Sequence, residues 1–196
     1  MNYLIWVLIG YISGSIPVGY WLGILKGIDL TEIGSGSTGA TNVLRNLGKV
    51  PALITLIFDA LKGFLPVYFA MRLQENNLMV LLVATACVFG HSKSIFLKFK
   101  GGKSSATGLG ILIAFSWQVA LIIFSIWTIV VLTSRYSSLG SIIAIPLTPV
   151  FLYLFHRPMP YVFFGIFAAI YIILFRHREN IQRLIAGTEL KIGKKD

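Results

Sequence analysis

The sequence contains few charged residues. Only 12% of its 196 residues are Asp, Glu, Lys or Arg, whereas a typical soluble domain has roughly 25%. Acidic residues are the scarcer kind, with 7 against 17 basic residues, which gives a formal net charge of +10. This composition leaves too little polar surface for a soluble globular protein, and its high apolar content excludes an intrinsically disordered chain.

Cysteine is also nearly absent. The single cysteine, Cys87, cannot form an internal disulfide bond, and its place within an apolar run indicates a small buried hydrophobic residue. The sequence also has no convincing cluster of residues with the spacing of metal ligands. We therefore expect a protein that uses neither a metal nor another cofactor.

Apolar residues, by contrast, make up 56% of the chain, and the mean hydropathy is +0.82. These values indicate an integral membrane protein, and the length fits one compact bundle, so we expect residues 1–196 to form a single membrane domain. The first apolar run, residues 3–25, would form a helix of about 35 Å. Such a helix is long enough to cross a bilayer and too long for the core of a cleaved signal peptide.

Five further apolar runs follow, at residues 50–71, 78–90, 104–134, 139–155 and 161–175. The run 104–134 would make a helix of about 46 Å, half again as long as the ~30 Å hydrocarbon core of a bilayer. It is therefore either one strongly tilted helix or two helices that turn near residues 115–117. The runs 78–90 and 104–115 are short enough to be re-entrant instead of crossing the membrane.

The distribution of basic residues favours one topology. If the long run is two helices, the chain crosses the membrane seven times, and fourteen of the 17 basic residues lie on one face. Basic residues accumulate on the cytoplasmic side of membrane proteins. We therefore predict an all-α bundle of seven transmembrane helices, with the N-terminus outside and the C-terminus inside the cell.

Some features within the apolar runs have ordinary packing explanations. The Gly-x-x-x-Gly motifs at 10–14 and 19–23 allow neighbouring helices to approach closely, and Pro17 is expected to kink the first helix. Asp59 and Lys62 lie one helical turn apart, and an isolated charge within a membrane is costly unless it is paired or hydrated. They are either a structural pair or direct participants in a site.

The first polar interruption is the segment 34–45, Gly-Ser-Gly-Ser-Thr-Gly-Ala-Thr-Asn-Val-Leu-Arg. Its small residues expose backbone N–H groups, its hydroxyl and amide side chains add donors, and Arg45 adds a guanidinium suited to phosphate. We interpret it as an anion-binding loop, with a flexible linker as the alternative. Its glycines also match a dinucleotide-binding fingerprint, but that motif requires a preceding strand, and an apolar membrane run precedes it here.

The second polar interruption spans residues 90–107. Residues 102–104, Gly-Lys-Ser, resemble the end of a P-loop, but Leu97 stands where that motif needs its first glycine, so nucleotide hydrolysis is not supported. The Gly-Gly turn is expected to place Lys103 at the start of the next helix, where the helix dipole favours phosphate. His91 has either a structural hydrogen-bonding role or a part in the site.

Two further polar segments lie at 134–141 and 176–191. If the second is helical, His177 and Asn180 share one face and could approach one ligand together. The basic residues of the tail, including those at 194–195, are expected at the membrane surface. Because the predicted topology brings all four polar segments to one membrane face, we expect them to meet in a single pocket.

As an ordered set, these segments resemble a known family, the bacterial membrane glycerol-3-phosphate acyltransferases that use acyl phosphate as donor (the PlsY family). The resemblance covers nearly the whole chain, and it is the order of the motifs that makes it specific. The motifs are Gly14-Ser-x-Pro17, Gly34-Ser-Gly-Ser-Thr-Gly-Ala-Thr-Asn42 with Arg45, Asp59-x-x-Lys-Gly63, Gly90-His91, Gly101-Gly-Lys103 with Ala106-Thr107, Ser138-Leu-Gly-Ser141, His177-Arg-Glu-Asn180 and Gly187-Thr-Glu189.

The resemblance implies an activity and a location. The family transfers a fatty acyl group from acyl phosphate to the sn-1 hydroxyl of glycerol 3-phosphate, which gives lysophosphatidic acid and phosphate in the first acylation of phospholipid synthesis. The implied active site lies on the cytoplasmic side of a seven-helix protein in the bacterial plasma membrane. The implied partners are the two substrates and membrane lipid, without nucleic acid, and we expect a monomer.

An enzyme with two anionic substrates mainly needs positive charge and hydrogen-bond donors. We assign catalytic roles to Ser35, Arg45, Lys103, His177 and Asn180, substrate or phosphate binding to Gly36, Ser37, Gly39, Thr41, Asn42 and Ser141, and supporting roles to Asp59, Lys62 and His91. His177 is either the general base or only a phosphate ligand, in which case a substrate phosphate takes the hydroxyl proton.

The chain departs from related patterns in two ways. Ser37 stands where the family has Asn, and it lacks the second polar atom of an amide; residues 104–105, Ser-Ser, replace a small apolar pair. The HxxxxD signature of other glycerolipid acyltransferases is absent, because Phe96, Tyr161 and Gln182 stand five residues after the three histidines. This absence argues against a His/Asp mechanism that uses acyl-CoA or acyl-carrier protein.

A small transporter or channel for phosphate or organic anions is the competing function. Basic residues and glycine-rich breaks within a helical bundle would suit it. Transport, however, requires a polar route across the membrane midplane. Only Asp59 and Lys62 clearly offer ionised groups there.

Overall fold

The computed structural model describes residues 3–73 and 76–193, and the regular secondary structure of these residues is helical. They contain no strand, only an isolated antiparallel bridge between Ser94 and Lys100. The expected all-α class is confirmed for the described residues. The basic residues at 194–195 lie outside them. The chain forms two compact units, an N-terminal unit that ends at Ala114 and a C-terminal unit that begins at Phe115.

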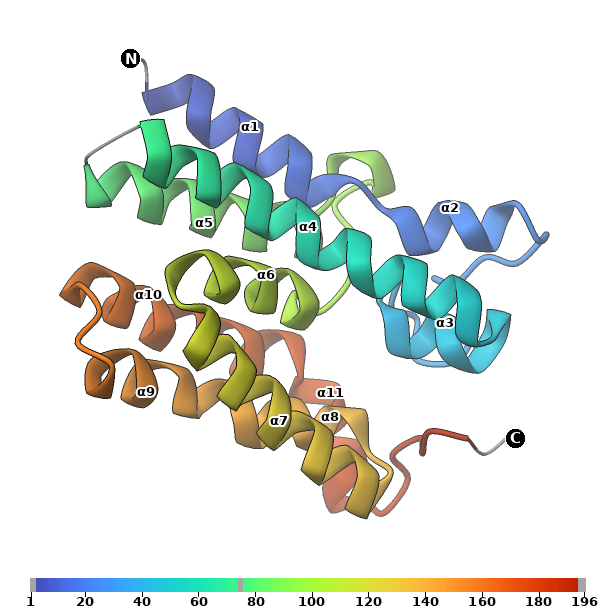
Figure 1. Cartoon of the computed structure of the whole chain (residues 1–196). Coiled ribbons are helices and arrows are strands. Elements are labelled where there is room, and N and C mark those ends of the chain that lie inside the picture. Colours follow the sequence, from blue (N-terminus) through green and yellow to red (C-terminus); the bar gives the residue numbers. More distant parts are fainter. Residues whose placement is uncertain (1–2, 74–75, 194–196) are drawn as a thin grey trace. The chain divides into compact units, whose positions relative to one another are not determined.

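Six helices begin in the N-terminal unit (Figure 1). They are α1 (Tyr3–Ser15), α2 (Val18–Ile24), α3 (Ala40–Leu47), α4 (Lys49–Leu73), α5 (Asn77–Ser92) and α6 (Ser105–Phe115), with a short 3-10 turn at Ile95–Leu97. Pro17 separates α1 from α2, because its ring cannot continue the helical hydrogen bonding. The expected kink is therefore a break between two short helices.

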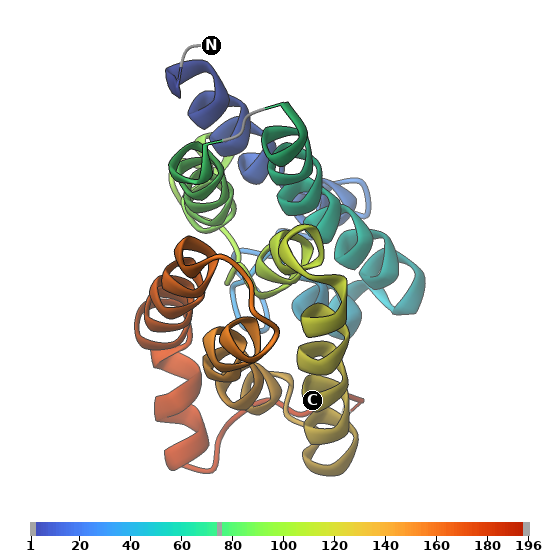
Figure 2. The same ribbon diagram turned by 60° about the vertical axis from the view of Figure 1, so that its left-hand side comes forward.

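Glycines allow close packing within this unit. A Cβ atom at Gly10 of α1 would lie 2.8 Å from the Val83 carbonyl oxygen of α5, and one at Gly90 of α5 would overlap the Tyr11 carbonyl of α1. Helices α1, α4 and α5 accordingly lie side by side in both ribbon views (Figures 1 and 2). The predicted role of the motif at 10–14 in helix packing is confirmed.

The C-terminal unit contains α7 (Trp117–Ser134), α8 (Ser137–Ala144), α9 (Thr148–Leu154), α10 (Met159–Ile170) and α11 (Arg178–Ile185), with a 3-10 turn at Ile145–Leu147 and a π-helical turn at Tyr171–Arg176. Ser116 separates α6 from α7, and its hydroxyl oxygen accepts a hydrogen bond from Val119 N at 3.5 Å. This serine is an N-cap, which gives α7 a defined start. The interpretation of residues 104–134 as two helices is thus confirmed.

Among the described residues, five helical stretches are long and apolar enough to cross a membrane: Tyr3–Ile24, Lys49–Leu73, Trp117–Ser134, Ser137–Leu154 and Met159–Arg176. In helix α7, the apolar residues Ile129 and Leu132 are 61% and 74% exposed. Such exposure is expected for side chains that face lipid. Helices α5 and α6 are apolar but shorter, with 16 and 11 residues. Their lengths are about 24 and 16 Å, so a total of seven crossings stays a prediction.

Candidate functional site

Asn42 of α3 organises the preceding loop, residues 25–39. Its side-chain nitrogen donates to the carbonyl oxygens of Leu30, Ile33 and Ser37 at 3.2, 3.1 and 2.9 Å, and its side-chain oxygen accepts from Ser35 N and Asn46 Nδ2 at 3.0 and 3.2 Å. The residue is 1% exposed. The side-chain amide has two hydrogens, and three carbonyl oxygens accept from them, so its donors are fully used within the loop. Asn42 therefore shapes the loop, a role different from the phosphate binding assigned to it from the sequence.

The same loop uses several of its own backbone amides. Ser35 N–H donates to Asn42, Gly36 N–H donates to the Ile33 carbonyl at 3.0 Å, and Gly39 N–H donates to Ser37 Oγ at 3.3 Å. The expectation that small residues expose their amides is therefore wrong for these three. A tight loop satisfies its amides internally, because an unpaired backbone group is costly to bury.

Helix α3 carries two of the predicted phosphate-binding side chains. Thr41 and Arg45 are four residues apart, so they share one face of the helix. Arg45 is half-buried. The N-cap position is held by Gly39, which has no side chain to cap the first turn, and the positive end of the helix dipole therefore faces the loop. This end of the N-terminal unit is suited to an anion.

Lys103 lies on a second loop of the same unit. Helix α6 begins at Ser105, two residues later, so the lysine precedes the helix instead of beginning it. The loop is fixed on both sides of the lysine: Gly102 N–H donates to the His91 carbonyl at 3.0 Å, and Ser104 Oγ–H donates to the Val88 carbonyl at 2.9 Å. The position of Lys103 is therefore set by the end of α5.

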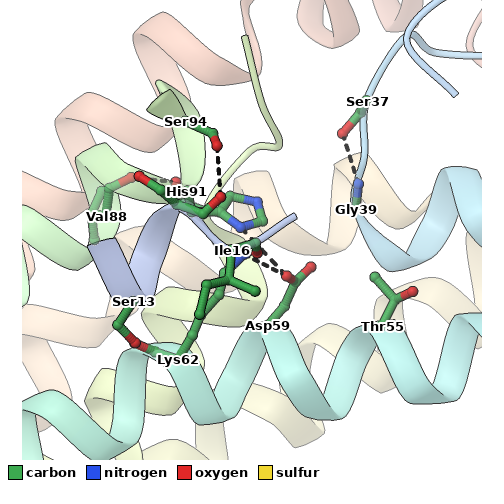
Figure 3. A network of polar contacts seen from close by, with 12 residues as sticks. Ser13, Ile16, Ser37, Gly39, Thr55, Asp59, Lys62, Val88, His91 and Ser94 are labelled. Carbon is green, nitrogen blue, oxygen red and sulfur yellow. Dashed lines mark hydrogen bonds and ion pairs between the residues drawn. The ribbon is translucent and has the colours of Figure 1, made fainter. Parts of the chain in front are cut away.

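Asp59, Lys62 and His91 are buried together within the N-terminal unit (Figure 3). Asp59 Oδ1 lies 2.7 Å from Lys62 Nζ and 3.6 Å from His91 Nδ1. Lys62 Nζ also donates to the Ile16 carbonyl, at the break before α2, at 2.9 Å. The expected pairing of Asp59 with Lys62 is confirmed. The ammonium of Lys62 thus serves both a carboxylate and a backbone carbonyl that the break of the helix leaves without its usual partner.

Glu189 is the centre of the polar network in the C-terminal unit. Its Oε1 accepts hydrogen bonds from Ser138 Oγ at 2.7 Å and Asn180 Nδ2 at 2.6 Å, and its Oε2 accepts one from Arg183 Nε at 2.8 Å. Burial of Glu189 raises the pKa of its carboxyl, but these hydrogen bonds outweigh burial and lower the pKa below its ordinary value of 4.5. The carboxylate therefore stays charged at neutral pH, and its hydrogen bond with Asn180 Nδ2 sets the orientation of the Asn180 side chain.

Sequence reasoning did not include Glu189 among the site residues. A usable signal was present, since Glu189 ends the motif Gly187-Thr-Glu189 and is one of two acidic residues in a predominantly basic tail segment. An acidic residue among basic ones is often only a solvated charge, however. Its burial becomes visible only when α8 and α11 are seen to converge on it.

His177 is buried and ends the π-helical turn. Its Nδ1 lies 3.0 Å from the Ile172 carbonyl oxygen. A carbonyl can only accept, so Nδ1 carries the hydrogen and the lone pair of the neutral ring belongs to Nε2. The π-helical turn, which is a rare conformation that is enriched at functional sites, supplies this carbonyl.

The structure therefore groups the predicted site residues by unit. Ser35, Gly36, Ser37, Gly39, Thr41, Asn42, Arg45, Asp59, Lys62, His91 and Lys103 belong to the N-terminal unit, and Ser141, His177 and Asn180 belong to the C-terminal unit. Ser141 is buried in α8. The meeting of all four polar segments in one pocket involves both units and stays a prediction.

Comparison with known proteins decides the family. The profile of the family described as "Glycerol-3-phosphate acyltransferase" matches residues 4–187. This chain belongs to that family. A glycerol-3-phosphate acyltransferase from a Nostoc species is 50% identical over 96% of this chain and 91% of its own length. The corresponding protein of Carboxydothermus hydrogenoformans is 48% identical over 95% of this chain and 94% of its own length.

Solved structures agree with this assignment. The crystal structure of PlsY, an integral membrane glycerol 3-phosphate acyltransferase, in its glycerol 3-phosphate form is 40% identical to this chain with a TM-score of 0.92, and the alignment covers 97% of this chain and 96% of that chain. Its lysophosphatidic acid form gives 39% identity and a TM-score of 0.90 over 97% and 95% of the two chains. The present chain is thus a multi-pass membrane acyltransferase of the glycerol-3-phosphate acyltransferase family.

Proposed function

We propose that this enzyme transfers a fatty acyl group from acyl phosphate to the sn-1 hydroxyl of glycerol 3-phosphate. The hydroxyl oxygen bonds to the acyl carbonyl carbon, the bond between that carbon and the phosphate oxygen breaks, and phosphate leaves. The products are lysophosphatidic acid and phosphate. An acyl phosphate is already activated, so the protein needs to hold two anions together and to stabilise charge on the carbonyl and the leaving phosphate.

One observation carries this proposal: helix α3 of the N-terminal unit brings a guanidinium and the positive end of a helix dipole to the polar loop, and both suit phosphate. Thr41 and Arg45 share a face of α3, whose first turn has no side-chain cap. The single cysteine, Cys87, is buried. A direct transfer between two bound anions is the chemistry that such a site supports, because it needs no covalent intermediate on the protein.

Roles follow from these positions. Ser35, Thr41 and Arg45 bind the acyl phosphate, while Gly36, Ser37, Gly39 and Asn42 keep the loop in the required shape. Lys103, His177, Asn180 and Ser141 position the phosphate and hydroxyls of glycerol 3-phosphate. Guanidinium and ammonium groups are suited to these anions because they donate charge-assisted hydrogen bonds.

The hydroxyl proton has two chemically reasonable acceptors, His177 Nε2 and an oxygen of the acyl phosphate. The contact from Nδ1 to Ile172 supports Nε2, because it keeps the lone pair on that nitrogen. Replacement of His177 by Ala separates the two. Loss of kcat by about 100-fold or more would assign the base to His177, whereas an intact kcat with a raised KM for glycerol 3-phosphate would assign the proton to the substrate phosphate.

The topology belongs to the same proposal. We place seven crossings in a bacterial plasma membrane, with the N-terminus outside, the C-terminus and the active site on the cytoplasmic side, and residues 1–196 acting as one domain in a monomer that contacts membrane lipid and no nucleic acid. A cysteine-accessibility scan in a Cys87→Ala background tests this topology. Labelling of a cysteine at position 191 from outside the cell would contradict it.

The decisive experiment uses purified protein in detergent micelles with acyl phosphate and labelled glycerol 3-phosphate. We expect lysophosphatidic acid as the product, and none from acyl-CoA or acyl-carrier protein. An Arg45→Gln variant should lose about 100-fold in kcat/KM, because the phosphate loses its charged partner. A transporter would instead give no product in micelles and would move phosphate only across sealed vesicles.

A further inference from the structure

The turn at Gly101–Gly102, which precedes Lys103, lies directly against His91. A Cβ atom at Gly102 would overlap the imidazole ring of His91, whereas a Cβ atom at Gly101 would overlap the His91 backbone carbonyl. Neither position therefore has room for a side chain. The two restrictions differ in kind, since one comes from a side chain and the other from the backbone.

Asp59 lies beside the other edge of the imidazole ring. Asp59 Oδ1 lies 3.6 Å from His91 Nδ1, while the carbon and nitrogen atoms around Nε2 lie against Gly102. Asp59 is in turn held by Lys62 Nζ at 2.7 Å. The ring is thus a buried spacer between α4 and the turn, as Figure 3 shows for its contact with Asp59.

The flanks of this loop have anchors that do not involve the ring. Ser94 Oγ–H donates to the Ser15 carbonyl at 2.6 Å, and Ser104 Oγ–H donates to the Val88 carbonyl at 2.9 Å. The loop would therefore remain attached to α1 and α5 if the ring were removed. The turn itself is also tied to the His91 backbone by the hydrogen bond from Gly102 N–H. What the ring adds is a steric support beneath Gly102, next to the backbone of Lys103.

We infer that His91 and Asp59 are positioning residues for Lys103: Asp59 orients the imidazole ring, and the ring sets the place of the Gly101–Gly102 turn. This inference rests on the proposed function, in which Lys103 binds the phosphate of glycerol 3-phosphate. A displacement of about 1 Å in such a group can cost roughly 100-fold in rate. His91 itself does not touch the substrate in this scheme.

The glycine pair provides a matched test. Gly102→Ala and Gly101→Ala are each made alone and together with His91→Ala, and kcat and KM for glycerol 3-phosphate are measured on protein that elutes as a single folded species in detergent. We expect about 100-fold loss of kcat/KM for each alanine at a glycine and about 10-fold for His91→Ala. The His91→Ala change should raise the activity of Gly102→Ala about 10-fold, because it removes the ring that the new Cβ would overlap. It should not raise that of Gly101→Ala, whose Cβ meets backbone.

Multiplied losses in the His91→Ala/Gly102→Ala double variant would overturn the inference, as would an active Gly102→Ala single variant. If replacing either glycine by alanine prevents folding, a double-mutant cycle of His91→Ala and Lys103→Ala still tests the inference. Without Lys103, removal of His91 should have little further effect on the residual activity, whereas a purely structural histidine would reduce it by the same factor as in the wild type. Asp59→Asn should reproduce the His91→Ala effect on KM in a weaker form.

These outcomes are separable from those of the proposed function. If the wild-type protein makes no lysophosphatidic acid from acyl phosphate, the proposed donor is wrong. The variant series can then be run with the donor that is active, and the rescue pattern of Gly102→Ala against Gly101→Ala retains its meaning. If the wild type is active and the rescue fails, only the positioning role of His91 is wrong.

Discussion

Asn42 and Glu189 are each the buried centre of a hydrogen-bond network, one in each unit of this enzyme, but the two side chains differ in charge. Asn42 in the N-terminal unit is a neutral amide that joins loop carbonyls to a loop amide. Glu189 in the C-terminal unit is a carboxylate that collects donors from α8 and α11. An amide can both donate and accept and so holds a folded-back loop, whereas a carboxylate only accepts and so joins separate segments that each bring a donor. The comparison predicts different responses to mutation and to pH.

The largest effect is expected at Asn42. Asn42→Ala removes the side-chain partner of the Ser35 amide and of the Leu30 and Ser37 carbonyls, whereas the Ile33 carbonyl still accepts from Gly36 N–H. Each buried polar group that loses its partner costs about 1–3 kcal/mol. We expect the free energy of unfolding to fall by about 3 kcal/mol or more, measured by thermal unfolding in detergent, with loss of activity. The control is Asn46→Ala, since Asn46 only donates to Asn42. Equal losses in the two variants would show that Asn42 is not the centre of the loop.

A smaller loss is expected at Glu189. Glu189→Ala removes three hydrogen bonds, but the Arg183 side chain is 28% exposed and can be hydrated in compensation. We expect a loss of about 2 kcal/mol, together with faster proteolysis near the end of α11. Glu189→Gln keeps the shape and one acceptor, so it should lose less. If Gln and Ala were equivalent, charge and not shape would hold this centre together.

Acidification should distinguish the two centres. The folded protein stabilises the charged form of Glu189 more than the protonated form. The pKa of this carboxyl in the folded state therefore lies below 4.5. Its stabilisation is fully present above about 4.5, the ordinary value, and is lost as the pH falls through the lowered folded pKa. Wild-type thermal stability should therefore drop below about pH 4.5 more steeply than that of Glu189→Gln. Parallel curves for the two proteins would remove Glu189 from the explanation.

The smallest effect is expected at Asp29, an acidic residue of the 25–39 loop. Asp29 Oδ1 accepts hydrogen bonds from Thr31 Oγ1 at 2.7 Å and Thr31 N at 2.8 Å, and these bonds lower the pKa of Asp29. Asp29 is only partly buried, however, so water and salt screen its carboxylate. Asp29→Asn should leave the melting temperature within the scatter of repeated scans. A drop as large as that of Asn46→Ala would show that the loop depends on surface charge as well as on Asn42.

Several elements of the fold could be predicted because they depend on local sequence. The charge-free runs predict the apolar helices, Ser116 can cap a helix, and Pro17 cannot continue one. The pairing of Asp59 with Lys62 is also local, since residues three apart meet on one helix face. Helix α5 extends a little further than its apolar run, to Ser92, because a hydropathy pattern does not mark where backbone hydrogen bonding ends.

The candidate site was less predictable from sequence. The segment 34–45 was recognised as a special loop, but its amides turned out to be used internally and Asn42 to be committed to shaping it. Glu189 was missed because its partners, such as Ser138, lie as much as 51 residues away. Which donor meets which acceptor in a loop depends on its conformation, and composition does not specify that conformation.

The amino-acid sequence by itself determined that this protein is a helical membrane protein, where most of its helices lie and, through the order of its motifs, which family it belongs to. These features depend on neighbouring residues, because transfer of an apolar run into lipid and the satisfaction of helical hydrogen bonds are local events. Only the tertiary structure decided that Asn42 holds a loop, that Glu189 joins α8 to α11, and that the His91 ring lies on Gly102. The physical reason is that a buried polar group takes whichever partners the folded chain brings within about 3 Å, and distant segments supply them.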